Sequence, residues 1–213
     1  MLSELLLGIA VGIIEMFVII GIWIKFDVFS IKEAEKREWA LVIVMGILTV
    51  GMNMLLLRQH GSACFTLNIL TVYVIMSMLA GIDFKKKMIP NSILAVGFVI
   101  RTILLLWEWI AYPDDFKQTI LSAAAGFTFG LLFLLLLSFI TRHGIGYGDV
   151  KLFAWIGYCV GLYDTYSILF YSALAAASAG IFLLLFKKAG RKKELPFAPF
   201  VYIGCYLVFY MLL

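Results

Sequence analysis

The sequence predicts an all-α, polytopic bundle of transmembrane helices. Of its 213 residues, 64% are hydrophobic and only 14% are charged, and the mean hydropathy is +1.05. Soluble domains are roughly half apolar and a quarter charged, so this chain has too little polar surface to cover itself in water. Its apolar runs are continuous rather than alternating, which favours helices over a strand barrel. About eight helices of ~20 residues each would leave no room for a large soluble domain.

Eight apolar stretches mark the expected helices. The first starts close to the N-terminus and lacks a small-residue cleavage site, so we expect a retained span rather than a removed signal peptide. The sixth is short and is interrupted by glycine. The connections between the stretches are short and hold the polar residues. The stretches cover residues 5–25, 39–57, 63–82, 92–111, 119–140, 150–162, 165–186 and 197–213.

No internal repeat or linker divides the chain, so residues 1–213 are expected to form a single integral-membrane domain. Residues 26–38 mix both charges and are expected to form a short cytoplasmic link. The three cysteines, Cys64, Cys159 and Cys205, lie far apart in apolar stretches and form no CxxC motif. We therefore expect buried thiols and neither a metal site nor a cofactor.

The distribution of Lys and Arg predicts the orientation in the membrane. Four connections, near 26–38, 83–91, 141–151 and 187–196, hold most of these residues, and the connections on the other side hold only Arg58 and Lys117. By the positive-inside rule the first set is cytoplasmic, so both termini lie on the outer side. The net charge of +4 then describes loops that orient the chain, and no nucleic-acid partner is expected. The cytoplasmic set comprises Lys32, Lys36, Arg37, Lys85, Lys86, Lys87, Arg142, Lys151, Lys187, Lys188, Arg191, Lys192 and Lys193.

Two aspartates stand at the expected cytoplasmic ends of different helices. Asp83 ends the third stretch and Asp149 opens the sixth. Ionisable groups beside a membrane are costly and often functional. If the two carboxylates lie close together, one pKa rises and the pair shares a proton. The charged carboxylate can then take a proton from water while the protonated one donates to a substrate carbonyl, which is aspartic peptide hydrolysis. Alternatively, Asp149 caps a helix and Asp83 pairs with the neighbouring lysines.

The residues around the aspartates favour a site. Gly144, Gly146 and Gly148 alternate just before Asp149, and glycines allow positive φ angles and close backbone approach. Such a loop can accommodate an extended substrate beside the carboxylate. After Asp83, the IPN segment at 89–91 is typical of a turn and a helix start, with Asn91 as the expected N-cap.

These stretches resemble the type IV prepilin peptidase family, membrane aspartic peptidases of the GxGD type. One part of the resemblance is GIDF at 81–84 followed by MIPN at 88–91. The second is GYGDVKL at 146–152, which is similar to the family's GxGDxKL signature. A weaker third is PFAPF at 196–200, where the family more often has Gly in place of Ala198. The resemblance covers about residues 60 to 213.

The resemblance implies a multi-pass protein of the bacterial cytoplasmic membrane. It implies an endopeptidase that removes the basic leader of type IV prepilins or pseudopilins, as used in pili and type II secretion. These precursors and membrane lipids are then the expected partners. It implies that Asp83 and Asp149 are the catalytic residues. Five further residues are expected to shape the site: Gly146, Gly148, Lys151, Pro90 and Asn91.

One departure from the family's pattern concerns its second reaction. Many members carry a zinc-bound cytoplasmic domain with paired CxxC motifs between the first two spans, and they N-methylate the new terminus with S-adenosylmethionine. Here residues 26–38 stand in that place and contain no cysteine. We therefore expect a short form with peptidase activity and without methyltransferase activity.

Three other ionisable residues lie within the stretches. We expect Glu15 to form a hydrogen bond to a neighbouring helix. Arg101 and Glu108 lie seven residues apart on one helical face, and a buried ion pair with another helix is expected for them.

Two other functions are compatible with the motifs. In a transporter or assembly subunit, Asp83 and Asp149 would bind an ion or relay protons. Transport sites lie near the midplane, however, and both aspartates are expected near one surface. Another GxGD-type protease, resembling the presenilin and signal-peptide-peptidase group, would pair GxGD with a Tyr-Asp motif. Here Ile82 precedes Asp83, and the IPN segment favours the prepilin group.

Overall fold

The computed structural model of the chain describes residues 2–29, 36–58, 62–141, 145–185 and 195–212. Eight helices and no strands occur within these residues, which confirms the all-α class. Of the expected cytoplasmic link, residues 30–35 lie outside the described residues, as do Arg142, His143 and the lysine-rich 187–193.

Each predicted apolar stretch forms one helix. Five helices, α1, α3, α4, α5 and α7, contain segments long and apolar enough to cross a membrane, and α2 and α8 hold shorter apolar segments. A multi-pass membrane bundle is therefore confirmed, although α6 has only 14 residues. The helices are α1 (Leu2–Lys25), α2 (Lys36–Arg58), α3 (Ala63–Lys86), α4 (Asn91–Ala111), α5 (Pro113–Ile140), α6 (Tyr147–Val160), α7 (Leu162–Leu185) and α8 (Ala198–Leu212).

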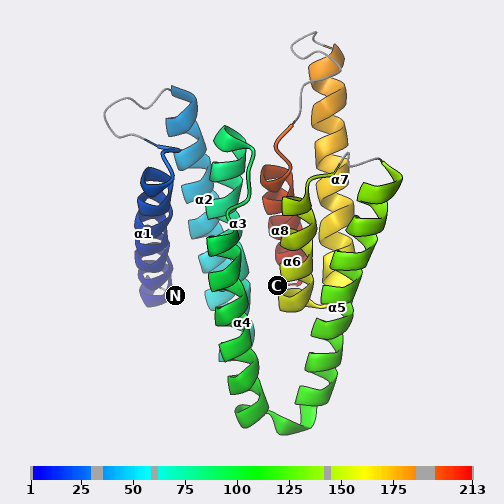
Figure 1. Ribbon diagram of the computed structural model, residues 1–213. Coiled ribbons are helices and arrows are strands. Elements are labelled where there is room, and N and C mark those ends of the chain that lie inside the picture. The colour runs from blue at the N-terminus through cyan, green and yellow to red at the C-terminus, as the bar shows by residue number, and fades with distance from the viewer. Residues whose placement is uncertain (1, 30–35, 59–61, 142–144, 186–194, 213) are drawn as a thin grey trace.

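Successive helices run in opposite directions through the bundle (Figure 1). The ends of α3, α5 and α7 and the beginnings of α4, α6 and α8 lie at the end drawn uppermost, which we call the upper end. The turn between α4 and α5 projects beyond the other helices at the opposite, lower end. All segments that carry the sequence motifs thus meet at the upper end.

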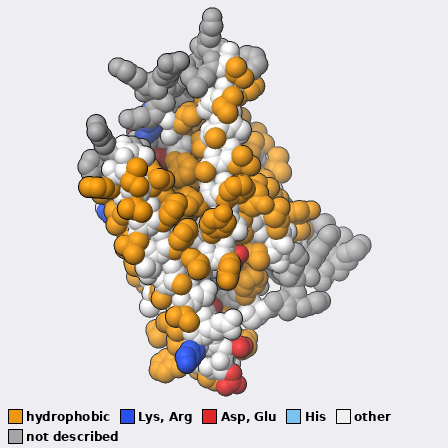
Figure 2. Space-filling model, turned by 90° about the vertical axis from the view of Figure 1, so that its right-hand side faces the viewer, with side chains coloured by type: hydrophobic (Ala, Val, Ile, Leu, Met, Phe, Trp, Pro, Cys, Tyr) orange, Lys and Arg blue, Asp and Glu red, His pale blue; other side chains and the backbone are white. Residues whose placement is uncertain are grey.

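Helix α3 is central, and its upper part is buried most completely: every residue from Ile75 to Asp83 is buried, whereas exposed and buried residues are mixed in its lower half. Its buried side chains, including Tyr73, Met76 and Leu79, join Trp155 of α6 and Tyr202 of α8 in one hydrophobic core. The hydroxyl groups of Tyr73 and Tyr202 hydrogen-bond each other inside this core. The outer face of the bundle is apolar as well: hydrophobic side chains cover most of the surface in Figure 2. A chain with apolar side chains both inside and outside suits a lipid environment.

Two helix pairs form the upper end. Helix α5 makes its most extensive contact with α6, whereas α3 packs against α8 and touches α6 much less. Gly126 of α5 and Gly157 of α6 lie backbone to backbone, and a Cβ atom on either residue would collide with the carbonyl of the other. Gly130 approaches the backbone of Phe153 in the same way. Small residues allow this close contact between membrane helices.

Candidate active site

Asp83 lies in the last turn of α3, because this helix continues to Lys86 rather than ending at residue 82. Its side chain is buried, with 6% of the residue exposed. The backbone N–H of Ala198, the first residue of α8, donates a hydrogen bond to Asp83 Oδ2 at 2.9 Å. Lys87 closes α3 in the left-handed conformation, with φ of 51°, and its N–H donates to the Asp83 carbonyl. The carboxyl group is thus held between the end of one helix and the beginning of another.

Asp149 lies in the first turn of α6, which begins at Tyr147, three residues before the predicted start. Its N–H donates to the carbonyl of Gly146 at 3.0 Å, and the residue is half-buried. Helix α6 is not among the helices of span length, and Asp149 stands at its upper end. Burial raises the pKa of the Asp149 carboxyl to about 6, and the negative charge of Asp83 raises this pKa as well. The fold therefore brings the two carboxyl groups within electrostatic reach of each other.

The described glycines before Asp149 do not adopt unusual dihedral angles, and only Gly148 is closely packed. Gly146 is the N-cap of α6 with φ of −67°, and within the described residues only Gly161 is a glycine with positive φ. The expectation of positive φ is therefore wrong for Gly146 and Gly148, and Gly144 lies outside the described residues. The expected close approach is confirmed at Gly148, where a Cβ atom would lie 3.3 Å from the Cβ of Ile89. A side chain here would push α6 away from the IPN segment.

The segment just before α6 is hydrogen-bonded to α5 through one side chain. Ser138, buried near the end of α5, donates from Oγ to the carbonyl of Ile145 at 3.0 Å. This bond holds the chain just before α6 begins. It therefore helps to set the position of Asp149 along the long axis of α5. The sequence motifs provide no signal for Ser138, because it lies in an apolar run.

The IPN segment starts α4 differently from the prediction. Pro90, not Asn91, occupies the N-cap position, and no side chain caps the helix. The assignment of Asn91 as N-cap is therefore wrong, because α4 already begins at this residue. The Asn91 side chain instead accepts a hydrogen bond at Oδ1 from Lys151 Nζ, at 3.2 Å. This bond joins the beginnings of α4 and α6, so the two family-like motifs touch each other directly.

The remaining predicted residues have structural partners. Glu15 accepts a hydrogen bond from Asn53 of α2 at 2.8 Å, which confirms a bond to a neighbouring helix. Arg101 pairs with Glu108 of its own helix at 3.0 Å, so the expected ion pair with another helix is wrong. Seven residues make two helical turns, and long side chains on one face can bridge them. The three cysteines are free and buried, as predicted.

An apolar hollow of about 520 Å³ lies beside the start of α6. We call it the α5 groove, and it is lined by Leu132, Leu135, Leu136, Ser138, Phe139 and Tyr147. Tyr147 and Phe139 are largely exposed, with 59% and 79% of their surfaces accessible. The groove therefore opens on the outside of the bundle within two residues of Asp149.

Comparison with known proteins gives consistent matches. The sequence profile described as the Type IV leader peptidase family matches residues 70–181, more than half of the 213 residues, and this segment includes both aspartates. The chain is 35% identical over 127 residues to a prepilin leader peptidase/N-methyltransferase of Bacillus subtilis, covering 60% of this chain and 48% of that protein. No solved structure gives a significant match.

Two further relatives extend the comparison. A protein of the same description from Xanthomonas campestris is 28% identical over 138 residues, covering 62% of this chain and 45% of the relative. Another, from Aeromonas salmonicida, is 27% identical over 192 residues, covering 86% of this chain and 61% of the relative. The chain thus spans about half the length of the curated relatives it matches. The fold and the paired carboxyl groups define a polytopic membrane protein with an acidic site at one end of its bundle. The chain belongs to the type IV leader peptidase family.

Proposed function

We propose that this protein is a membrane aspartic endopeptidase that removes the basic leader from type IV prepilin-like or pseudopilin precursors. The observation that carries the proposal is the electrostatic coupling of Asp83 and Asp149, two aspartates from different helices at one end of the bundle. Family membership and relatives described as prepilin leader peptidases support the same substrate class. We place the site at the cytoplasmic face of the bacterial inner membrane, because the helix ends that flank the predicted cytoplasmic connections lie at this end.

The proposed mechanism uses the two carboxyl groups in different protonation states. The N–H of Ala198 stabilises negative charge on Asp83, which makes Asp83 the base that takes a proton from water. Asp149, with its pKa raised to about 6, is the group that holds a proton and donates it to the oxygen of the scissile carbonyl. As Asp83 takes this proton, the water oxygen bonds to the carbonyl carbon and a tetrahedral intermediate forms. The C–N bond then breaks while Asp83 gives its proton to the leaving amine and Asp149 takes back a proton from a hydroxyl group of the intermediate, which restores both carboxyl groups. Neither a metal ion nor a covalent intermediate is required in this scheme.

The α5 groove provides a place for the substrate's apolar segment. A prepilin-like precursor carries its basic leader immediately before an apolar helix, and that helix stays in the bilayer when the leader is removed. The groove is apolar, faces outward and ends at Tyr147, two residues before Asp149. A helix lying along α5 would bring its first residues to the carboxyl pair.

We further propose that the N-methyltransferase activity named for the relatives is not carried by residues 1–213. Those proteins are about twice as long as the matched region, and here residues 26–35 alone separate α1 from α2. This connection contains no cysteine that could form the zinc site expected in the longer family members. Incubation with S-adenosylmethionine and cleaved substrate should leave the new N-terminus unmethylated.

The peptidase proposal is tested by co-expressing the full chain with candidate prepilins and following leader removal by gel shift and N-terminal mass spectrometry. Asp83→Asn and Asp149→Asn should each abolish cleavage while the protein still inserts in the membrane. Asp114→Asn, an exposed carboxylate at the lower end, is the matched control and should cleave normally. Near-normal processing by either catalytic variant would refute the two-aspartate mechanism. In an ion or proton transporter, by contrast, the variants would change flux across vesicles and leave leaders untouched in every case.

A further inference from the structure

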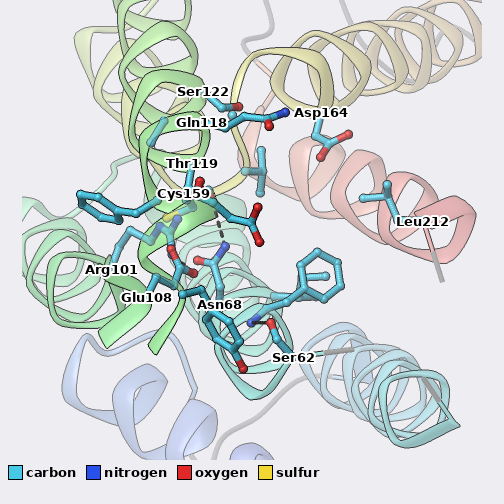
Figure 3. Close-up of a pocket in the computed structure, with 18 of the residues that line it drawn as sticks. Ser62, Asn68, Arg101, Glu108, Gln118, Thr119, Ser122, Cys159, Asp164 and Leu212 are labelled. Atoms are coloured by element: carbon cyan, nitrogen blue, oxygen red, sulfur yellow. Dashed lines mark hydrogen bonds and ion pairs between the residues drawn. The ribbon is translucent and has the colours of Figure 1, made fainter. Parts of the chain in front are cut away.

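A second cavity, which several polar side chains line, lies at the lower end of the bundle, opposite the aspartate pair. Its volume is about 530 Å³, within the range of small-molecule sites. Residues from α3, α4, α5, α6, α7 and α8 line it, and Figure 3 shows side chains from several of these helices facing the same space. The proposed peptidase mechanism makes no use of this cavity.

The cavity exists because α6 is short. With 14 residues it is about 21 Å long, whereas α5, with 28 residues, is about 42 Å long. Helix α6 ends at Val160, and its C-cap Gly161, with φ of 82°, turns the chain directly into α7. Below this turn nothing from α6 fills the space between α3, α4 and α5. The hollow is therefore part of the architecture rather than a gap between loosely packed side chains.

Two buried hydrogen-bond acceptors in the cavity have no donor within the described residues. Asn68 is 7% exposed, and its amide nitrogen donates to the carbonyl of Cys159 at 2.8 Å, which leaves Oδ1 without a partner. Glu108 pairs with Arg101 through Oε1, while its buried Oε2 also lacks a partner. Figure 3 shows Asn68 and Glu108 together on one side of the cavity. Leaving such atoms unsatisfied costs about 1–3 kcal/mol each, so a ligand that supplies N–H groups fits here.

The charges of the lining favour a cation. Among the described lining residues the formally charged side chains are Arg101, Glu108, Asp115 and Asp164. The Arg101–Glu108 pair is neutral overall, and the Arg101 Nε–H is also directed to the carbonyl of Tyr158. Asp115 and Asp164 therefore leave the lining with a formal excess of negative charge. No group of three His, Cys, Asp or Glu side chains in the described chain is arranged to hold a metal ion, which favours an organic cation.

We propose that this cavity binds a primary ammonium group. Glu108 Oε2 and Asn68 Oδ1 accept two of its hydrogen bonds, and Asp164 contributes the negative charge across the cavity. A primary ammonium has three N–H donors, whereas a quaternary ammonium of the same charge has none. The group can belong to a lipid, as in a phosphatidylethanolamine headgroup, or to a free amine. Phe65, Tyr112 and Leu212 of the lining expose apolar surface, which a lipid's acyl chains could contact while the headgroup enters the cavity.

The first experiment compares two lipids that differ only in the N–H donors. The full chain in maltoside micelles is mixed with phosphatidylethanolamine or with phosphatidylcholine of the same acyl chains, and bound lipid is counted by native mass spectrometry. We expect about tenfold preference for phosphatidylethanolamine, the effect of one charge-assisted hydrogen bond. Asp164→Asn should reduce this preference severalfold, while Asp114→Asn, an exposed carboxylate outside the lining, should keep it.

A second experiment distinguishes the two possible sources of the ammonium group, a lipid headgroup and a free amine. Ethylamine and tetramethylammonium are each added to lipid-free protein, and the thermal unfolding temperature is measured. Stabilisation by ethylamine alone, without a lipid preference, assigns the cavity to a free amine, and a lipid preference assigns it to the headgroup. If Asp164→Asn does not fold, Asp115→Asn, an exposed lining carboxylate, takes its place. Equal binding of both lipids together with equal effects of both amines, or identical behaviour of the lining and control variants, would overturn the proposal.

Discussion

The backbone N–H of Ala198 donates a hydrogen bond to the carboxylate of Asp83 across 115 residues of sequence. The bond joins the end of α3 to the beginning of α8 in the buried part of the upper end. A backbone donor at the start of a helix stabilises an anion particularly well, because the helix dipole adds to the hydrogen bond. The PFAPF segment thus contributes to the site through its backbone, and its side chains need not touch a substrate.

Replacing Ala198 by Pro tests this contribution. Proline lacks the N–H but is tolerated at the first position of a helix, so α8 should still form. We expect kcat/KM for leader cleavage to fall about tenfold or more, since hydrogen bonds to charged groups contribute about 1.5–3 kcal/mol. Ala198→Ser keeps the N–H and serves as the control, with activity close to that of the parent chain. Full activity of Ala198→Pro in a folded protein would exclude this role for the bond.

The Lys151–Asn91 bond predicts coupled effects of two exposed residues. Both side chains lie at the surface, so we expect Lys151→Met and Asn91→Ala to change stability by less than about 1 kcal/mol. Each should nevertheless lower cleavage severalfold, because the bond holds the first turn of α6, which carries Asp149. A double-mutant cycle on kcat/KM measures the coupling, and the double variant should be no worse than the poorer single variant. Fully additive losses would show that the two side chains act separately.

The raised pKa of Asp149 predicts a stability effect that depends on pH. The pKa of this carboxyl is about 6 in the folded protein and lies near its ordinary value of 3.8 in the unfolded chain, so the folded state binds the proton more tightly. This contribution to stability is fully present below about pH 4 and is lost as the pH rises through 6. Asp149→Asn removes the ionisation and should stabilise the protein at pH 8 by up to roughly 3 kcal/mol, but not at pH 4. Thermal unfolding at the two pH values measures the difference, and a stabilisation that does not change with pH would contradict it.

The contact between α5 and α6 predicts a large effect of one methyl group. In Gly157→Ala the new Cβ would meet the backbone of Gly126, which cannot move aside as a side chain can. We expect a loss of about 3 kcal/mol or more, visible as a lower unfolding temperature in detergent. Gly21→Ala is the matched control, since a Cβ there meets nothing within 4 Å, and it should be neutral or stabilising. Similar unfolding temperatures for the two variants would show that the helices can separate at little cost.

The positions of the helices were predicted well from the sequence. A continuous apolar run inside a membrane must satisfy its own backbone hydrogen bonds, and an α-helix does so. The predicted ends of the helices were less accurate. Helix α3 extends past Asp83 and α6 begins before Asp149, because polar residues can occupy the last or first turn of a helix. The two aspartates were found through residue type and spacing. Their catalytic roles remain a prediction, which the Asp83→Asn and Asp149→Asn variants will test.

Other parts of the site could not be read from residue types. The Ala198 N–H and the Ile145 carbonyl are backbone groups: every residue has the carbonyl, and every residue except proline has the N–H. Asn91 looked like a helix cap by its chemistry, but the preceding Pro90 already holds the cap position. The lower cavity depends on the length of α6 relative to its neighbours, and this follows from three-dimensional packing rather than from any motif.

The division of the upper end into two helix pairs has a consequence for the proposed two-aspartate site. Asp83 belongs to the pair α3 and α8, and Asp149 belongs to the pair α5 and α6, whose backbones lie in contact. Direct packing between α3 and α6 is slight, although the Asn68 amide of α3 donates a hydrogen bond to the Cys159 carbonyl of α6, and α4 packs against both helices. The separation of the carboxyl groups therefore depends on how the two helix pairs pack against each other and against α4, and not only on the packing within either pair.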